Sequence, residues 1–221
     1  PTTRLPVPVL RSVLAVDDAG WIGYQHGLSR FETGSGGLRH WAADGDDPQA
    51  PPSGAIDLLR RAPDGSVWLS ANGGGLQHPD ADGGGLGTYL ASPDTGVPAP
   101  DTEELAFASD GAVWISGEGG LHRFDAGENR FERVAGGPQQ RVFGFAFAPD
   151  GTVWAQRLGA LEHFELRQDR LHLLHRVDAD AGFPALEVGG LVIDAVGDLW
   201  MTSARGLWHC APAQGRLRRY G

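Results

Sequence analysis

The stretch Ser109-Asp-Gly-Ala-Val-Trp-Ile-Ser-Gly-Glu-Gly-Gly-Leu-His-Arg-Phe-Asp125 decides the fold, because its plan returns along the whole chain. In each copy an aliphatic-Trp pair is followed, six or seven residues after the Trp, by a small residue and a leucine. The five tryptophans are Trp21, Trp68, Trp114, Trp154 and Trp200, at spacings of 47, 46, 40 and 46 residues. A period of this length is typical of repeat architectures.

Each repeat contains four short runs with β character, separated by turn signals. In the third repeat these runs cover about residues 104–109, 112–116, 121–124 and 130–134. Asp-Gly between two apolar runs is a strong hairpin signal, because both residues tolerate the positive φ that the turn requires. It recurs as Asp64-Gly65, Asp110-Gly111 and Asp150-Gly151, and Val196-Gly197 stands in its place in the fifth repeat. The pattern predicts a four-stranded antiparallel meander.

The strands of a repeat grade from apolar to polar. The first strands, such as Val13-Leu-Ala-Val16, Phe143-Gly-Phe-Ala-Phe147 and Leu191-Val-Ile193, are nearly all apolar, which predicts burial on both faces. Within Phe143 to Phe147 we expect the three phenylalanines to share one face. The last strands, such as Arg130-Phe-Glu-Arg133, are polar and belong at an exposed outer edge.

These features predict an all-β fold, a β-propeller of four-stranded antiparallel blades with five blades in this chain. The expected blades cover approximately residues 8–43, 54–91, 102–136, 141–178 and 187–221. We interpret residues 1–221 as a single propeller domain or as a fragment of a larger propeller. A Trp at one fixed repeat position is expected to fill the gap between adjacent blades rather than to hold a ligand.

The composition excludes several classes of function. A formal net charge of −10 opposes binding to a nucleic-acid backbone or to an anionic membrane surface. The single cysteine, Cys210, excludes an internal disulfide, and we expect it to be a strand residue with no catalytic role. No apolar run approaches the length of about 20 residues that a membrane helix needs. Any membrane attachment would therefore depend on segments outside this chain.

The repeat unit resembles the two-component regulator propeller repeat. Ser109 to Asp125 is the closest copy of that unit, and Gly20-Trp-Ile-Gly-Tyr-Gln-His-Gly-Leu-Ser-Arg-Phe31 is the next. The resemblance covers about residues 8 to 220. It implies the extracytoplasmic sensor region of a bacterial membrane receptor, periplasmic in a Gram-negative cell, with a histidine kinase or a diguanylate cyclase elsewhere in the parent protein. Family members usually have more than five blades, so ring closure stays open.

No strong catalytic or metal constellation is present. None of the eight histidines shows metal-ligand spacing, and the Asp-Gly turns lack the spacing of calcium loops. His78, His163 and His209 share one repeat position with Arg30 and Arg123, which predicts a structural contact. We therefore expect no catalytic residue, no metal and no cofactor.

If the propeller binds a ligand, two sets of loops share one mouth of its channel. The loops between the second and third strands offer Gln25, His26, Asn72, Glu118, Arg157 and Arg205. The loops that enter the first strands offer Glu103, Glu104, Arg141 and Glu187. These residues differ between repeats whose scaffold is alike, as both a functional surface and neutral drift would produce.

Three functions are compatible with this pattern. The first is a non-catalytic sensor that binds a small molecule, carbohydrates included, or a protein, and that can form a homodimer through its propeller. The second is a lyase or hydrolase that resembles the propeller streptogramin lyases and lactonases, which need a general base and a divalent metal at the channel mouth. Here His26 is the only neutral base among these residues, and metal analysis together with mutation of His26 and Glu118 would separate an enzyme from a sensor. The third is a scaffold for protein partners.

Overall fold

The Asp-Gly turns close tight hairpins, as their sequence predicts. The structure, a computed structural model, describes residues 9–17, 19–43, 50–51, 54–79, 86–183 and 188–221. In the third repeat the Asp110 Oδ1 atom accepts a hydrogen bond of 2.9 Å from the Ala112 amide, and Gly111 has a φ of 86°. Asp150 and Gly151 repeat this arrangement, with a hydrogen bond of 3.0 Å from the Thr152 amide and a φ of 84°. These turns connect the first and second strands of their blades.

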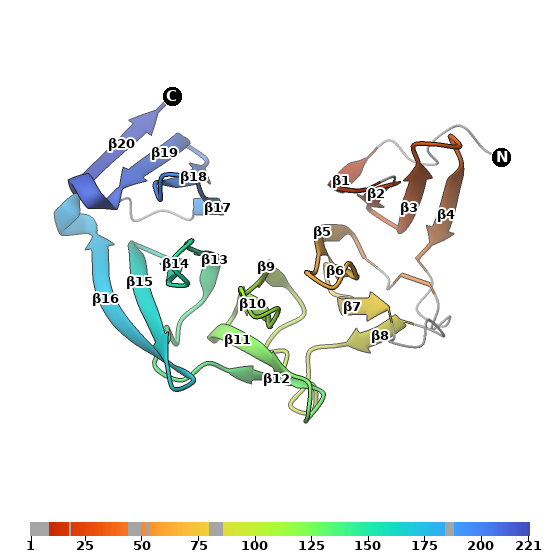
Figure 1. Ribbon diagram of the computed structural model, residues 1–221, viewed down its shortest axis with the longest axis horizontal. Coiled ribbons are helices and arrows are strands. Elements are labelled where there is room, and N and C mark those ends of the chain that lie inside the picture. The colour runs from red at the N-terminus through yellow and green to blue at the C-terminus, as the bar shows by residue number, and fades with distance from the viewer. Residues whose placement is uncertain (1–8, 18, 44–49, 52–53, 80–85, 184–187) are drawn as a thin grey trace. The chain divides into compact units, whose positions relative to one another are not determined.

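Five four-stranded antiparallel sheets result, each with its strands in sequence order (Figure 1). The chain divides into two compact units, Pro1–Thr102 and Glu103–Gly221. The first unit contains blade 1, with β1 (Leu10–Val16), β2 (Ala19–Tyr24), β3 (Gly27–Glu32) and β4 (Leu38–Ala42). It also contains blade 2, with β5 (Ile56–Arg61), β6 (Val67–Ala71), β7 (Gly75–Pro79) and β8 (Leu86–Tyr89).

The second unit contains the other three blades, apart from the first residue of β9. Blade 3 has β9 (Thr102–Phe107), β10 (Val113–Gly117), β11 (Gly120–Asp125) and β12 (Arg130–Arg133). Blade 4 has β13 (Val142–Phe147), β14 (Val153–Arg157), β15 (Ala160–Arg167) and β16 (Arg170–Asp178). A 3₁₀ turn, η1 (Ala179–Ala181), leads to blade 5, with β17 (Val188–Ile193), β18 (Leu199–Ser203), β19 (Gly206–Ala211), the turn η2 (Pro212–Gln214) and β20 (Arg216–Tyr220).

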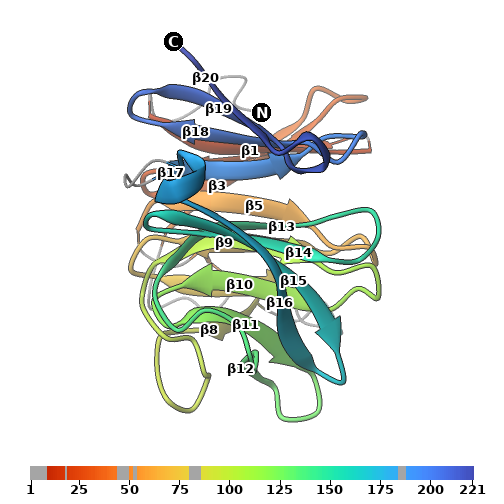
Figure 2. The same cartoon turned by 90° about the vertical axis from the view of Figure 1, so that its left-hand side faces the viewer.

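The predicted fold class is confirmed, since the five sheets correspond to the five expected blades. The prediction that they form one domain stays a prediction. The outer strands are exposed as expected, and β16, with 9 residues, is the longest strand of blade 4 (Figure 2). None of the helical segments in the described part of the chain is long and apolar enough to cross a membrane.

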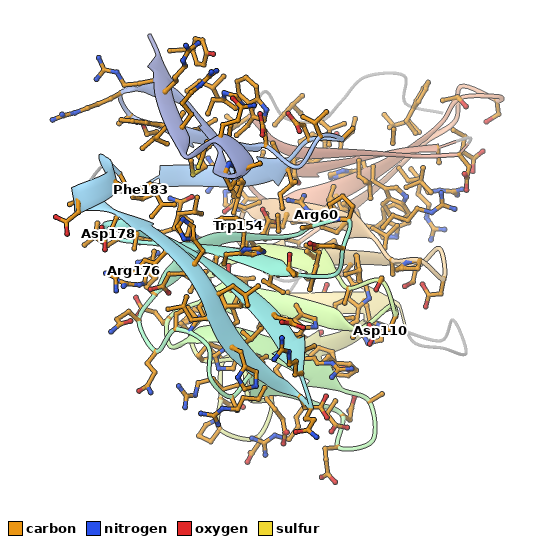
Figure 3. The ribbon with its side chains drawn as sticks, turned by 60° about the vertical axis from the view of Figure 1, so that its left-hand side comes forward. Arg60, Asp110, Trp154, Arg176, Asp178 and Phe183 are labelled. Atoms are coloured by element: carbon orange, nitrogen blue, oxygen red, sulfur yellow. The ribbon has the colours of Figure 1, made fainter. Side chains whose placement is uncertain are left out.

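Three of the five repeated tryptophans pack where two blades of the same unit meet, as predicted. In the second unit Trp114 is fully buried in a cluster that joins blade 3 to Val142 and Phe145 of blade 4. Trp154, labelled in Figure 3, lies with Phe183 in the cluster that joins blades 4 and 5. In the first unit Trp21 packs against the cluster around Ile56 that joins blades 1 and 2. Burial between blades gives each unit its core.

The small residue before each leucine is explained by a close backbone approach. A Cβ atom at Gly120 would lie 1.9 Å from the Pro138 carbonyl oxygen, and one at Gly75 would lie 2.4 Å from that of Tyr89. Both glycines have positive φ values, 103° and 76°, which L side chains rarely adopt. In blade 4 Ala160 occupies this position, is paired with Asp178 and is not among the residues with a positive φ.

Two predicted inner strands are less buried than expected. Val13 on β1 is 68 % exposed and Val192 on β17 is 61 % exposed. Both lie on faces that no further blade of the same unit covers, whereas Phe145 on β13, in the middle of the second unit, is 1 % exposed. Apolar composition alone does not reveal whether a neighbouring blade follows.

The repeated histidines have the predicted structural role. His163 stacks on Trp154 with ring centroids 4.2 Å apart, and His209 stacks on Trp200 at the same distance. His163 Nε2 also lies 2.7 Å from the Thr152 hydroxyl, and burial lowers the pKa of this histidine. Cys210 is buried in the core of blade 5, where burial raises the pKa of its thiol to about 11. A thiol in that state is not a nucleophile at neutral pH.

Candidate functional site

A β-bulge near the start of the first strand directs one residue out of the regular ladder in blades 1, 2 and 4. The register shifts between Leu10 and Ser12, between Ile56 and Leu58, and between Val142 and Gly144. The residues inserted there are Arg11, Asp57 and Phe143. Bulges of this kind commonly re-aim a side chain next to a functional site. The bulge also corrects one expectation, because it removes Phe143 from the regular alternation that Phe145 and Phe147 follow.

This position can be located in every repeat by counting back from the Trp. It lies eleven residues before the Trp in blades 2 to 5 and ten residues before it in the shortened blade 1. The five residues are Arg11, Asp57, Glu103, Phe143 and Gly189. Their chemistry differs completely although the strands that carry them repeat. The repeat therefore places a residue of different chemistry at this position in each blade.

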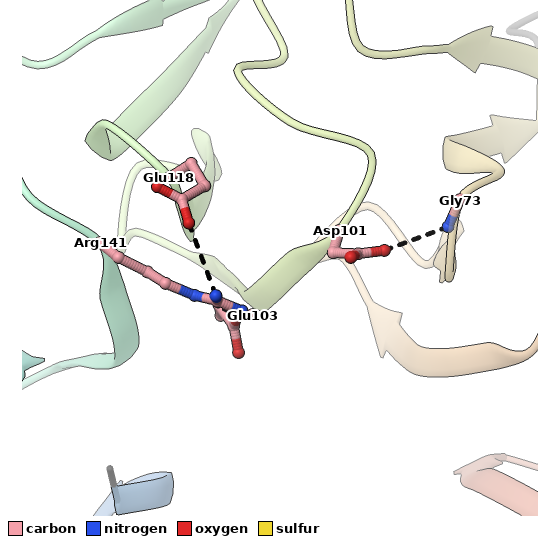
Figure 4. Close-up of polar contacts among 5 residues, drawn as sticks. All are labelled: Gly73, Asp101, Glu103, Glu118 and Arg141. Atoms are coloured by element: carbon pink, nitrogen blue, oxygen red, sulfur yellow. Dashed lines mark hydrogen bonds and ion pairs between the residues drawn. The ribbon is translucent and has the colours of Figure 1, made fainter. Parts of the chain in front are cut away.

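In the first unit the two bulge residues bind each other. Arg11 Nε donates a hydrogen bond of 2.7 Å to Asp57 Oδ1, and the Ser12 hydroxyl donates one of 2.7 Å to the Ile56 carbonyl. Both contacts connect blade 1 to blade 2. The loop after β6 is tied down separately, since the Gly73 amide donates to Asp101 Oδ1 at 3.2 Å (Figure 4).

In the second unit three predicted site residues come together around one guanidinium. Arg141, just before β13, donates from Nε to Glu103 Oε1 at 2.8 Å, and its Nη2 also contacts that oxygen. Its Nη1 lies 3.5 Å from Glu118 Oε1 in the turn after β10 (Figure 4). Two carboxylates and one guanidinium leave this cluster with a net negative charge of one. The cluster connects blade 3 to blade 4.

A hollow of about 410 Å³ opens beside this cluster, within the second unit. Its lining comes from three consecutive blades and includes Glu103, Arg141, Phe143, Gly189, Thr202 and Ser203. The volume falls in the range of small-molecule sites, about 300–1,000 Å³. The absence of a side chain at Gly189 keeps the hollow open next to Thr202, whose hydroxyl would lie 2.8 Å from a Cβ atom there.

The lining offers mixed chemistry. The Arg141 guanidinium lies 5.2 Å from the centroid of the Phe143 ring, which holds it over an aromatic face. Thr202 and Ser203 add two hydroxyl groups, and Glu103 adds a carboxylate. Such a set can exchange hydrogen bonds with a polar, hydroxylated ligand and contact an apolar patch of it through Phe143.

The remaining predicted site residues do not join this cluster. Gln25, His26, Asn72 and Arg205 are exposed in the turns between second and third strands. Glu104 is half-buried and accepts a hydrogen bond of 3.0 Å from the Leu105 amide. Glu187 lies outside the described residues. Their assignment to a ligand stays a prediction.

Arg157 has a different environment from the one that its place in the sequence suggests. Its Nε atom donates a hydrogen bond of 2.9 Å to Glu162, whose side chain is only 9 % exposed. Arg176 Nη1 lies 3.9 Å from the same carboxylate, and its Nε lies 3.2 Å from Asp178 (Figure 3). Arg157 thus neutralises a buried carboxylate of its own blade.

Sequence reasoning missed Arg11, Asp57, Phe143, Thr202 and Ser203. A usable signal for the bulge residues exists, since this position lies ten or eleven residues before each Trp. Thr202 and Ser203 directly precede the turn that supplied Arg205. Among the residues that the structure describes, no group of three or more His, Cys, Asp or Glu side chains is arranged to hold a metal ion.

Comparison with known proteins identifies structural neighbours only. No protein-family model and no curated protein matches the sequence. The extracellular domain described as that of the hybrid two component system BT3049 from B. thetaiotaomicron is similar in structure, with a TM-score of 0.74 and 14% sequence identity. The corresponding domain of BT4673 from the same organism gives 0.71 and 17%. Neighbours of this kind agree with the family resemblance of the repeat.

The chain spans only part of these neighbours. The alignments cover 95% of the chain in both cases, but 29% of the BT3049 domain and 28% of the BT4673 domain. Virginiamycin B lyase from Staphylococcus aureus is also similar, with a TM-score of 0.69, 15% identity and coverage of 98% of this chain and 71% of the lyase. At such identities the similarity establishes the propeller fold and no activity.

Proposed function

We propose that the chain is a non-catalytic sensor module of a bacterial signal-transduction receptor, located outside the cytoplasm, with its binding site in the hollow beside Arg141. The observation that carries this proposal is the joining of Glu103, Arg141 and Glu118 at the rim of a hollow of about 410 Å³. Extracellular domains of two-component proteins among the structural neighbours support the receptor context.

The hydroxyl, carboxylate and guanidinium groups of the hollow suit a hydroxylated small molecule such as a carbohydrate. Oligosaccharides present many donors and acceptors together with apolar ring faces, and Phe143 supplies the aromatic contact. A protein partner, or a second copy of the chain, remains the other occupant that a sensor of this kind could take.

The test is a calorimetric and thermal-shift screen of the purified chain against neutral and uronic-acid oligosaccharides. We expect a bound sugar to raise the melting temperature, and Arg141→Ala and Thr202→Val to remove the shift. Arg205→Ala is the matched control, because Arg205 is an exposed turn residue outside the lining of the hollow. Light scattering with and without sugar measures self-association. No thermal shift together with no self-association would contradict the proposal.

A lyase is the second candidate, favoured by the structural similarity to virginiamycin B lyase, which has also been solved in a catalytically inactive form with quinupristin. His26 would be the general base. The test incubates the chain with quinupristin and measures its bound metal. Turnover that His26→Ala and Glu118→Gln abolish, with stoichiometric metal, would replace the sensor proposal with the enzyme.

A further inference from the structure

A second concave site lies in the first unit, on the groove where blade 1 meets blade 2. The groove encloses about 440 Å³ and is lined by Trp21, Trp41, Arg30, Arg39 and Asp17, among others. None of these residues belongs to the loops at the mouth. The groove is therefore distinct from the predicted ligand-binding loops.

Two tryptophans and two arginines form a ladder along this groove. The Trp21 and Trp41 rings are stacked, with centroids 5.9 Å apart and planes 13° from parallel. The Arg30 guanidinium lies 5.9 Å from the Trp21 centroid, and the Arg39 guanidinium lies 4.6 Å from that of Trp41. Packing on a ring fixes a guanidinium while it leaves the N–H edges free to donate.

The two arginines are direct cross-strand neighbours. Arg30 on β3 is paired in register with Arg39 on β4, and like charges placed directly opposite each other destabilise a sheet. Blade 3 shows the complementary arrangement, since Arg123 is opposite Glu132 at the same position. Blade 1 thus has a second cation at the position where blade 3 has a carboxylate.

The positive charge in the groove is only partly neutralised. Arg30 Nη1 lies 3.1 Å from Glu32 Oε1, but among the residues that the structure describes no carboxylate lies within ion-pair distance of Arg39. Asp17, the acidic group of the lining, is already held by Arg61 through two hydrogen bonds of 3.0 and 2.6 Å. A cationic groove on a chain of net charge −10 is selective for anions at short range.

We propose that this groove is a binding site for an oxyanion, a carboxylate, sulfate or phosphate group carried by a small molecule. Arg39 donates to the anion from the edge of its guanidinium, and Arg30 provides the second positive charge. Bidentate recognition of this kind is the characteristic chemistry of arginine. The half-buried Trp21 and Trp41 rings contact the apolar part of the ligand.

The experiment measures the melting temperature and the binding heat of the intact chain with sodium sulfate, sodium phosphate and sodium citrate, each against sodium chloride at equal ionic strength. We expect at least one oxyanion to bind and to raise the melting temperature. Arg39→Gln should weaken that binding at least tenfold. The three salts distinguish the sulfate, phosphate and carboxylate forms of the same chemistry.

Arg39→Glu is the sharper variant, because it recreates in blade 1 the Arg-Glu pairing of blade 3. We expect it to melt higher than the wild type in chloride and to lose the response to oxyanions. Arg218→Gln, at the same position in blade 5, is the matched control and should respond like the wild type. Arg141→Ala should also keep the response, which separates this groove from the hollow of the proposed sensor site.

Two results would overturn the proposal. One is an equal oxyanion response in the wild type and in Arg39→Gln. The other is an Arg39→Glu protein that is folded but melts lower than the wild type in chloride, since that would mean that the two arginines do not repel each other.

Discussion

The Trp200 indole nitrogen donates a hydrogen bond of 2.9 Å to Asp194 Oδ2 across the first hairpin of blade 5. The other carboxylate oxygen of Asp194 accepts from the Val196 and Asp198 amides, both at 3.0 Å. In blades 2 to 4 the turn is closed by an Asp two positions further along, where blade 5 has Val196. In blade 5 the side chain of Asp194 thus both closes the turn and accepts a hydrogen bond from Trp200.

Asp194→Ala should lower the melting temperature more than Asp150→Ala does. Asp194 accepts from two amides and an indole, whereas Asp150 accepts from the Thr152 amide and hydroxyl only. The Trp200 hydrogen bond lowers the pKa of Asp194 below its ordinary value of 3.8. Its stabilising effect is therefore present above about pH 4 and is lost as the pH falls through the folded-state pKa. Calorimetry of both variants at neutral and acidic pH measures this difference.

Ala108→Asn should stabilise the protein. Ala108 holds in blade 3 the place of Asp194, six residues before the Trp, and the buried Trp114 Nε1 atom has no hydrogen-bond partner among the described residues. An amide oxygen at position 108 can accept from it, and one satisfied buried donor is worth about 1 kcal/mol. Chemical denaturation measures the gain. Ala148→Asn is the control, because Trp154 Nε1 is not among the buried unpartnered atoms; an equal gain there would refute the explanation.

Arg157→Gln and Arg141→Gln should differ in their effect on stability. Loss of Arg157 leaves the buried Glu162 with only the distant Arg176, and removing one partner of a buried pair costs about 3 kcal/mol. Arg141 is 42 % exposed, and exposed ion pairs are worth below about 1 kcal/mol. Urea denaturation of both variants measures the two losses. If both variants lose the same small amount of unfolding free energy, Arg157 does not neutralise a buried carboxylate and is again a candidate ligand-binding residue.

His122 should make the protein less stable as the pH falls. Burial, followed by the charge of Arg133, lowers the pKa of His122 from 6.5 to about 4. Between these values the unfolded chain binds a proton that the folded chain does not, so acid favours unfolding, by about 2 kcal/mol between pH 7 and pH 5. His122→Gln should show a correspondingly smaller loss over that interval. His26→Gln, in an exposed turn, should behave like the wild type.

Much of the fold could be predicted from the sequence because the same turn and strand signals occur in successive repeats. Asp-Gly turns, the Trp on the second strand and the small residue before the leucine each have one local cause. The exposure of Val13 and Val192 could not be predicted, because it depends on which blade lies beside them. The bulge at Phe143 also escaped, since alternation of apolar residues gives no sign of an inserted residue.

The candidate site was predicted in part. Glu103, Glu118 and Arg141 were placed correctly at one end of the strands, and the structure joins them. Arg157 was placed at that end too, but no local pattern reveals that Glu162, five residues later, holds its guanidinium. This ion pair depends on the cross-strand register of β14 and β15, which the composition of the two strands does not give.

Stacking of histidines on the repeated tryptophans connects tryptophan fluorescence to histidine protonation. The imidazoles of His78, His163 and His209 lie 4.3, 4.2 and 4.2 Å from the rings of Trp68, Trp154 and Trp200. A protonated imidazole in van der Waals contact with an indole quenches its emission, whereas a neutral one does so weakly. The Trp154 emission should therefore fall in acid, at a pH below the ordinary histidine range because burial lowers the pKa of His163, and replacing His163 would assign the change to blade 4.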